Sequence, residues 1–144
     1  MGDSKKILVV DDEPDMVDLL ATVLNGEGFE VETYTDGRSA LARVLEEPPD
    51  LLLLDLMMPD MDGIETCEKI RENPVNRNTL IVMLTARSED YSQIAGFNAG
   101  ADDYINKPIK PKVLISRLNA ILRRYGKRQP VQAEIDDEAI RLND

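Results

Sequence analysis

Histidine is absent from this 144-residue chain, tryptophan is absent too, and Cys67 is the single cysteine. The lack of histidine excludes histidine metal ligands, a histidine general base and a phosphohistidine formed within the chain. One cysteine excludes an internal disulfide and fits a reducing, cytoplasmic setting. No apolar run approaches the ~20 residues that a membrane span needs. The polar N-terminal residues lead directly into a strand-like run, so we expect neither a signal peptide nor a membrane partner.

Basic residues are outnumbered, and the formal net charge is −11. A nucleic-acid-binding face needs clustered Lys and Arg to neutralise phosphates. The cations of the one local basic stretch are Arg117, Arg123, Arg124, Lys127 and Arg128. We interpret this stretch as the C-terminal end of a helix, where the helix dipole favours cations, rather than as a DNA contact. Hydrophobic residues make up 42% of the chain, which is typical of a soluble globular domain.

Strand-like runs alternate with helix-like segments, a pattern typical of a β-α-β protein. The expected strands are 6–11, 29–34, 50–55, 79–85 and 103–106. The expected helices are about 14–26, 37–46, 64–72, 88–99 and 111–124, with Ser88 as a helix cap. The first, third and fourth strands are unbroken apolar runs, as in strands covered on both faces, whereas the second alternates and suits an edge. We therefore predict an α/β fold with a doubly wound parallel sheet and five helices.

Residues 126–144 differ from the rest of the chain. They begin with a Gly-Lys-Arg-Gln-Pro stretch of linker composition and continue as an acidic segment with scattered Ile and Leu. Such a segment cannot bury a core alone. We expect residues 1–125 to form one domain, and 126–144 to be a linker or tail, or the start of an effector domain missing from this chain.

Acidic side chains follow two of the predicted strands. Asp11 and Asp12 come after the first strand, and Asp55 ends the third. The carboxyl ends of parallel strands meet at one edge of the sheet, so these groups should crowd together. Two carboxylates ~4 Å apart repel by about 4 kcal/mol at an effective dielectric near 20. Hard oxygen ligands favour Mg²⁺, or Mn²⁺, as the cation that relieves this repulsion. For the pair alone, helix capping by Asp12 and a solvated Asp11 remain the alternative.

A hydroxyl and an ammonium follow two further strands, at Thr85 and Lys107. Asp55 follows four leucines, where a carboxylate is costly to bury without partners, and a carboxylate can form an aspartyl-phosphate. Phosphoryl transfer places charge on three equatorial oxygens. A metal ion, the Lys107 ammonium, and the Thr85 hydroxyl together with the Ala86 amide could each hold one of them. These residues predict a phosphoryl-transfer site.

Over about residues 5–125 the chain resembles the receiver domains of two-component response regulators. The matching motifs are Asp11-Asp12, Asp55 with Met58-Pro59 and Asp62-Gly63, Thr85-Ala86, and Lys107-Pro108. The resemblance implies a five-stranded, flavodoxin-like sheet in the order 2-1-3-4-5. It implies a signalling switch rather than an enzyme with its own substrate, since the domain catalyses only its own phosphorylation and dephosphorylation. The phosphoryl donor would be a histidine of a partner sensor kinase, and the acceptor Asp55.

The resemblance also assigns roles around the acceptor. Asp12, Asp55 and the backbone carbonyl of Met57 would ligate Mg²⁺, with Asp11 acting mostly through water. Lys107 would pair with Asp55 or its phosphate, and its bond to Pro108 is commonly cis in the family. Thr85 would turn toward the phosphate, and Tyr104 would follow from an outward to an inward rotamer. These movements would shift a bistable element made of the loop after the fourth strand, the fourth helix and the fifth strand.

The segment 100–108 and the Arg123-Arg124 ending are similar to OmpR/PhoB-type transcription factors, in which a winged-helix domain follows. DNA binding would then belong to a C-terminal domain outside this chain. Members of that subfamily dimerise through the fourth helix, fifth strand and fifth helix, using charged pairs. Asp103 and Arg117 match this pattern, whereas Gln93 and Val113 replace the usual cation and Glu. A dimer here would rely on packing by Ile94, Ala95 and Val113.

Three other functions compete with this interpretation. A metal-dependent phosphohydrolase typically needs a second acid two residues after the nucleophile, but position 57 is Met. An FMN carrier of the same topology needs a Ser/Thr/Gly-rich phosphate loop and flanking aromatics, but aromatics make up 4%. An unphosphorylated receiver that serves only as an interaction module stays open.

Overall fold

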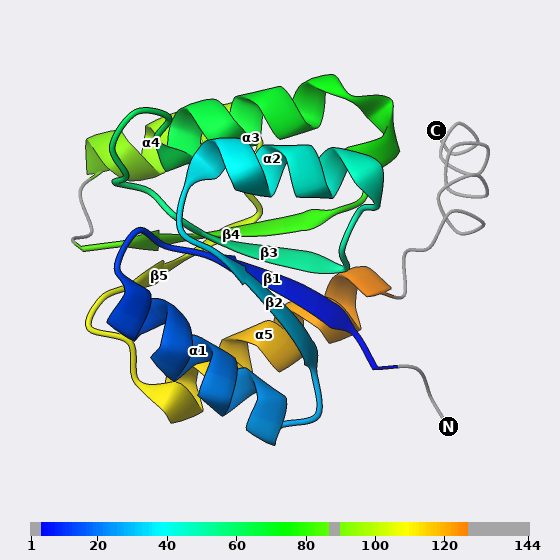
Figure 1. Ribbon diagram of the computed structural model, residues 1–144, viewed down its shortest axis with the longest axis vertical. Helices are drawn as coiled ribbons and strands as arrows, with labels where there is room; N and C mark the ends of the chain where they lie inside the picture. Colours follow the sequence, from blue (N-terminus) through cyan, green and yellow to red (C-terminus); the bar gives the residue numbers. More distant parts are fainter. Residues whose placement is uncertain (1–3, 87–89, 127–144) are drawn as a thin grey trace, which may run out of the picture. The chain divides into compact units, whose positions relative to one another are not determined.

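The computed structural model describes residues 4–86 and 90–126, except for the side chains of 90–94 and 126. Five parallel strands form one sheet in the order β2-β1-β3-β4-β5 (Figure 1). They are β1 (Lys6–Val10), β2 (Glu30–Tyr34), β3 (Leu51–Asp55), β4 (Leu80–Thr85) and β5 (Asp103–Asn106). The helices are α1 (Pro14–Gly26), α2 (Gly37–Glu46), α3 (Gly63–Glu72), α4 (Asp90–Ala99) and α5 (Pro111–Gly126), with a short 3₁₀ turn, η1 (Pro74–Asn76). The predicted fold class and strand order are confirmed.

The chain divides into two compact units, Met1–Ile109 and Lys110–Asp144. The first contains the whole sheet, with α1 on one face and α2, α3 and α4 on the other (Figure 1). The described part of the second is α5, which carries an apolar stripe at helical spacing, Leu114, Leu118 and Ile121. The predicted tail from residue 127 onward lies outside the described residues.

Hydrophobic burial explains which runs became strands. The four leucines of β3 have no exposed surface, and neither do residues 7–10 of β1 and 81–84 of β4. Such runs are expected where helices cover both faces of a parallel sheet. Strand β2 lies at the edge of the sheet, as its sequence predicted, but its exposure does not alternate: Glu30 and Thr33 are exposed and the other three residues are half-buried. The central strands therefore anchor the sheet, and their carboxyl ends have fixed positions.

Helix ends follow local capping chemistry. Asp36 caps α2 by accepting a hydrogen bond from the Ser39 amide at 2.7 Å, and Asp62 caps α3 in the same way with the Glu65 amide at 2.9 Å. Helix α1 begins at Pro14, and the residue at its N-cap position is Glu13, whose side chain makes no capping bond. The alternative role of Asp12 as the helix cap is therefore wrong. Helix α3 begins one residue earlier than predicted, and α5 continues to Gly126. The predicted cap Ser88 lies outside the described residues.

The Arg71 side chain joins α3 to the starts of β4 and β5. Its guanidinium donates to the carbonyls of Gly100 at 3.0 Å, Asn76 at 2.8 Å and Thr79 at 2.7 Å, and pairs with Asp102 at 2.9 Å. Asp102 also accepts a hydrogen bond from the Ile81 amide at 2.8 Å. One fork-shaped cation thus satisfies three carbonyls, two in the connection before β4 and one in the connection before β5. Among the described helices, none is long and apolar enough to cross a bilayer.

Candidate functional site

The predicted site residues lie at the carboxyl ends of four adjacent strands. Asp11 follows β1, Asp55 ends β3, Thr85 ends β4, and Lys107 follows β5. The strand register aligns these ends, because Asp55 pairs with Leu84 and Thr85 pairs with Asn106. The parallel sheet therefore delivers two acids, a hydroxyl and an ammonium to one edge, where ligands bind in open α/β sheets.

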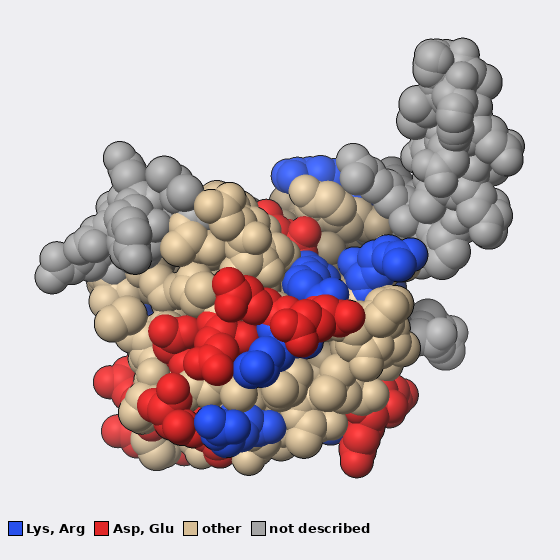
Figure 2. Space-filling view, turned by 90° about the horizontal axis from the view of Figure 1, so that it is seen from above, with Lys and Arg blue, Asp and Glu red and all other residues tan. Residues whose placement is uncertain are grey.

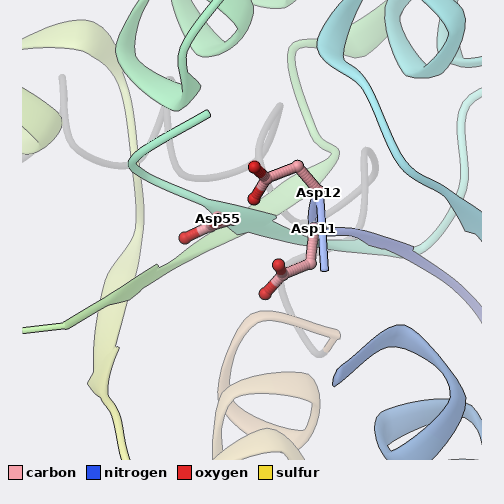
Figure 3. Close-up of side chains that lie close together, drawn as sticks. All are labelled: Asp11, Asp12 and Asp55. Atoms are coloured by element: carbon pink, nitrogen blue, oxygen red, sulfur yellow. The ribbon is translucent and has the colours of Figure 1, made fainter. Parts of the chain in front are cut away.

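Three carboxylates meet at this edge. Oxygens of Asp11, Asp12 and Asp55 lie within 4.8 Å of one another. Figure 3 shows Asp11 and Asp12 projecting to opposite sides of the end of β1, with Asp55 beside them on β3. Asp11 is fully buried and Asp55 is 3% exposed, whereas Asp12 is exposed. The acids predicted to crowd together do so, and Asp12 opens the cluster to solvent.

Lys107 supplies positive charge to this cluster. Its Nζ lies 3.0 Å from Asp11 Oδ2 and 3.4 Å from Asp55 Oδ1, and the Lys107–Pro108 bond is cis. The sequence predicted the contact with Asp55, but the shorter contact with Asp11 was missed. Asp11 Oδ1 accepts a hydrogen bond from the Glu13 amide at 3.0 Å. Both oxygens of Asp11 therefore have partners within the protein.

The electrostatics of the site show a shortage of positive charge. Burial, together with the charge of Asp11, raises the pKa of Asp55 to about 7, although Lys107 and a backbone hydrogen bond from Met57 act in the opposite direction. Burial acts to lower the pKa of Lys107, but its hydrogen bond to Asp11 and the negative charges of both aspartates outweigh this, and the pKa is raised. One ammonium does not neutralise three carboxylates.

This donor set fits a hard divalent cation. Carboxylate oxygens in a group open to solvent on one side are ligands that Mg²⁺ prefers, since this ion keeps several waters. Asp12 and Asp55 have oxygens available for it, whereas the oxygens of Asp11 are already engaged by Lys107 and Glu13. Met57 is 69% exposed, and its backbone donates a hydrogen bond to the Asp55 carboxylate. The donor set therefore agrees with ligation by Asp12 and Asp55 and a less direct part for Asp11.

The loop after Asp55 packs tightly on the strand end. A Cβ at Gly63 would overlap the carbonyl oxygen of Asp55 and lie 2.8 Å from Leu56 Cα. The Gly63 amide donates to the Leu56 carbonyl at 2.9 Å. The start of α3 is thus seated directly against the backbone of Asp55. The sequence analysis noted the Asp62-Gly63 pair only as part of a motif, and missed this contact.

The remaining predicted residues fall in three places. Thr85 is 3% exposed at the end of β4, Ala86 is exposed next to it, and Tyr104 is 6% exposed on β5. Of the residues predicted for a dimer face, Asp103 is half-buried and accepts a hydrogen bond from the Tyr104 amide at 2.8 Å. Val113 and Arg117 are on α5, in the second unit, while the side chains of Gln93 and Ile94 lie outside the described residues.

Comparison with known proteins decides the family. The model of the response regulator receiver domain matches residues 7–119. The chain belongs to the response regulator receiver domain family. Its likeness to DNA-binding response regulator MtrA of Mycolicibacterium smegmatis is 48% identity over 94% of this chain and 58% of the relative. With the alkaline phosphatase synthesis transcriptional regulatory protein PhoP of Bacillus subtilis, identity is 43% over 94% and 55%.

Solved structures agree with this receiver assignment. A CheY-like receiver domain protein from Methanospirillum hungatei matches with a TM-score of 0.82 and 32% identity, over 88% of this chain and 99% of that one. DrrB of Thermotoga maritima, an OmpR/PhoB homologue, matches with a TM-score of 0.76 and 36% identity, over 85% and 54%. The receiver therefore spans a little over half the length of these regulators. The family and its OmpR/PhoB-type character are confirmed, which favours the signalling interpretation over a phosphohydrolase or an FMN carrier.

Proposed function

We propose that this receiver is the phosphorylation-controlled switch of a two-component system, with Asp55 accepting a phosphoryl group from a histidine of a sensor kinase. The observation that carries the proposal is the buried Asp55 carboxylate, which lies within 4.8 Å of two further acids and 3.4 Å from the Lys107 ammonium. The absence of histidine from the chain agrees with a donor on another protein. A carboxylate so placed can act as a nucleophile.

In the transfer, an Asp55 oxygen forms a bond to phosphorus while the bond from phosphorus to the donor nitrogen breaks. Asp12, Asp55 and the Met57 carbonyl would hold Mg²⁺, which supplies positive charge to the phosphoryl oxygens. Lys107 stabilises a second oxygen, and Asp11 holds the ammonium in place by its 3.0 Å contact. The Thr85 hydroxyl and the Ala86 amide donate hydrogen bonds to the third phosphoryl oxygen. The protein's contribution is mainly position and charge.

The switch is read out on the side of β4 and β5. Phosphorylation adds nearly two negative charges, which favours a position of Thr85 that binds the phosphate and a buried position of Tyr104. We assign transcriptional output to a DNA-binding domain beyond this chain, as in its curated relatives. On the face that Figure 2 shows, acidic and basic side chains are interspersed, with no continuous basic area among the coloured residues. We also propose that the protein acts in the cytoplasm and that it forms a homodimer through α4, β5 and α5.

Incubation with acetyl phosphate or phosphoramidate and Mg²⁺, followed by intact-mass measurement, tests the proposal. We expect one added phosphoryl group, which disappears in Asp55→Asn and when EDTA removes the metal. Asp60→Asn is the matched control, because Asp60 lies in the same loop but pairs with Arg38 at the surface, 2.7 Å away. An adduct that persists in Asp55→Asn contradicts the proposed acceptor, and no adduct on the wild type favours a pure interaction module.

A further inference from the structure

The Tyr104 side chain is buried against helix α4. The ring is edge-on to the Phe97 ring, with centroids 4.9 Å apart and planes at 66°. Its hydroxyl reaches Gly96, and the hydroxyl oxygen accepts a hydrogen bond from the backbone of that residue. A Cβ built at Gly96 would overlap the tyrosine hydroxyl and lie 2.5 Å from its Cζ. The tyrosine therefore occupies space that any residue other than glycine would fill.

Helix chemistry alone does not explain a glycine at this position. Glycine inside a helix is less favourable than alanine by about 1 kcal/mol. Among the glycines that the structure describes, those with positive φ are Gly28 and Gly100, at 95° and 111°, and Gly96 is not one of them. Its backbone conformation is thus open to alanine. What distinguishes Gly96 is the neighbour that an added methyl group would meet.

We infer that Gly96 is a positioning residue for the Tyr104 switch, because its missing side chain is the space that admits the inward tyrosine hydroxyl. This inference rests on the proposed function, because it takes Tyr104 to be a switch residue. It goes beyond that function by identifying the residue that makes the buried state of Tyr104 possible. Burial of the ring then requires Gly96 of α4 to face β5. The position of α4 and the rotamer of Tyr104 are coupled through this contact, so a change at Tyr104 reaches the surface of α4.

Replacement of Gly96 by alanine tests the contact directly. We expect Gly96→Ala to displace Tyr104 outward, since a side chain can rotate more cheaply than the helix can retreat. Gly26→Ala is the matched control, because nothing lies within 4 Å of a Cβ on that helical glycine. The chain has four tyrosines, so 3-fluorotyrosine labelling gives a ¹⁹F spectrum in which Tyr104→Phe identifies the Tyr104 signal.

The readout is the broadening of that signal by a dissolved paramagnetic agent. We expect a several-fold increase for Tyr104 in Gly96→Ala and no change in Gly26→Ala. Protection of Tyr104 equal to that in the wild type would overturn the inference.

A double-mutant cycle separates the contact from general damage to the helix. Gly96→Ala should lower the urea midpoint of the wild type, but leave it level or raise it in the Tyr104→Ala background, where the methyl group has room. If Gly96→Ala does not fold, the double variant Gly96→Ala/Tyr104→Ala should fold again. An equal loss in both backgrounds overturns the inference.

The same variants distinguish this inference from the proposed function. Gly96→Ala should still gain one phosphoryl group from acetyl phosphate, because Gly96 is not among the acidic cluster and Lys107. A wild type that gains none contradicts the proposed function, while exposure of Tyr104 in Gly96→Ala would still support the contact. If the wild type gains the phosphoryl group but Tyr104 stays as protected in Gly96→Ala as in the wild type, the Gly96 inference alone is overturned.

Discussion

Replacing Arg71 with methionine should destabilise the receiver far more than the same replacement of an exposed cation such as Arg77. Its guanidinium makes three hydrogen bonds to carbonyls and one ion pair with Asp102, and its side chain is 20% exposed. Two of the carbonyls belong to buried residues, Asn76 and Thr79. Methionine keeps the packing of the aliphatic stem but leaves these acceptors and the carboxylate of Asp102 without their partner.

The size of this loss follows from the partners left behind. Breaking a buried pair by removing one member costs about 3–5 kcal/mol. The Asp102 side chain is 26% exposed and regains some hydration, so we expect the lower end, about 3 kcal/mol. With a urea m value of about 2 kcal/mol/M for a domain of this size, the midpoint should fall by about 1.5 M.

Equilibrium urea unfolding followed by far-ultraviolet circular dichroism measures this change. Arg77→Met is the matched control, because Arg77 is exposed and contributes its backbone amide, which the substitution keeps. It should stay within about 0.5 kcal/mol of the wild type. Arg71→Lys should fall between the two, since an ammonium keeps the charge but not the fork of donors. An Arg71→Met variant as stable as Arg77→Met would refute this account of the hydrogen bonds of Arg71.

Two further predictions concern charge. Arg43 and Lys6 hold the pKa of Glu32 at about 2, chiefly through the Arg43 hydrogen bond, so its contribution to stability is full above its ordinary value of 4.5 and is lost as the pH falls toward 2. Between pH 4.5 and pH 2, the free energy of unfolding of the wild type should fall by about 1 kcal/mol more than that of Glu32→Gln in urea titrations. This value is discounted because the Glu32 side chain is about one-third exposed. An equal fall in both proteins would contradict the prediction. Lys107→Met removes the cation shared by Asp11 and Asp55, so Mg²⁺ should raise its urea midpoint more than it raises that of the wild type or of the exposed Lys112→Met. An equal or smaller rise would show that Lys107 does not offset the acidic cluster.

The sheet could be predicted from the sequence because burial leaves a local signature. Each strand was located to within one residue, since strands covered on both faces read as continuous apolar runs bounded by polar residues. The meeting of Asp11, Asp12 and Asp55 was predictable for the same reason, because parallel connections bring all carboxyl ends to one edge. Topology converts distances in sequence into proximity without any knowledge of side-chain contacts.

Contacts between single side chains left no such signature. Lys107 and Asp11 are 96 residues apart, and nothing local distinguishes this lysine from the others. Nothing in the local sequence marks Arg71, in the last turn of α3, as a residue that reaches the carbonyls of two distant connections. Glu32 read as a charge that guards a sheet edge, yet it bonds Arg43, Lys6 and Tyr34. Such partners depend on how elements pack, which periodicity does not encode.

The Asp11–Lys107 contact bears on how the proposed switch would work. Because Asp11 is fully buried and lies 3.0 Å from the ammonium, we expect it to hold Lys107 in place whether or not Asp55 is modified. Lys107 then has little need to move when a phosphoryl group arrives, since it is already 3.4 Å from the acceptor. A conformational signal requires a group whose position differs between the two states. In the proposed switch, that requirement leaves the β4–β5 side of the site, with Thr85 and the Tyr104–Gly96 contact, as the part that would report phosphorylation, while β1 and Lys107 would stay in place.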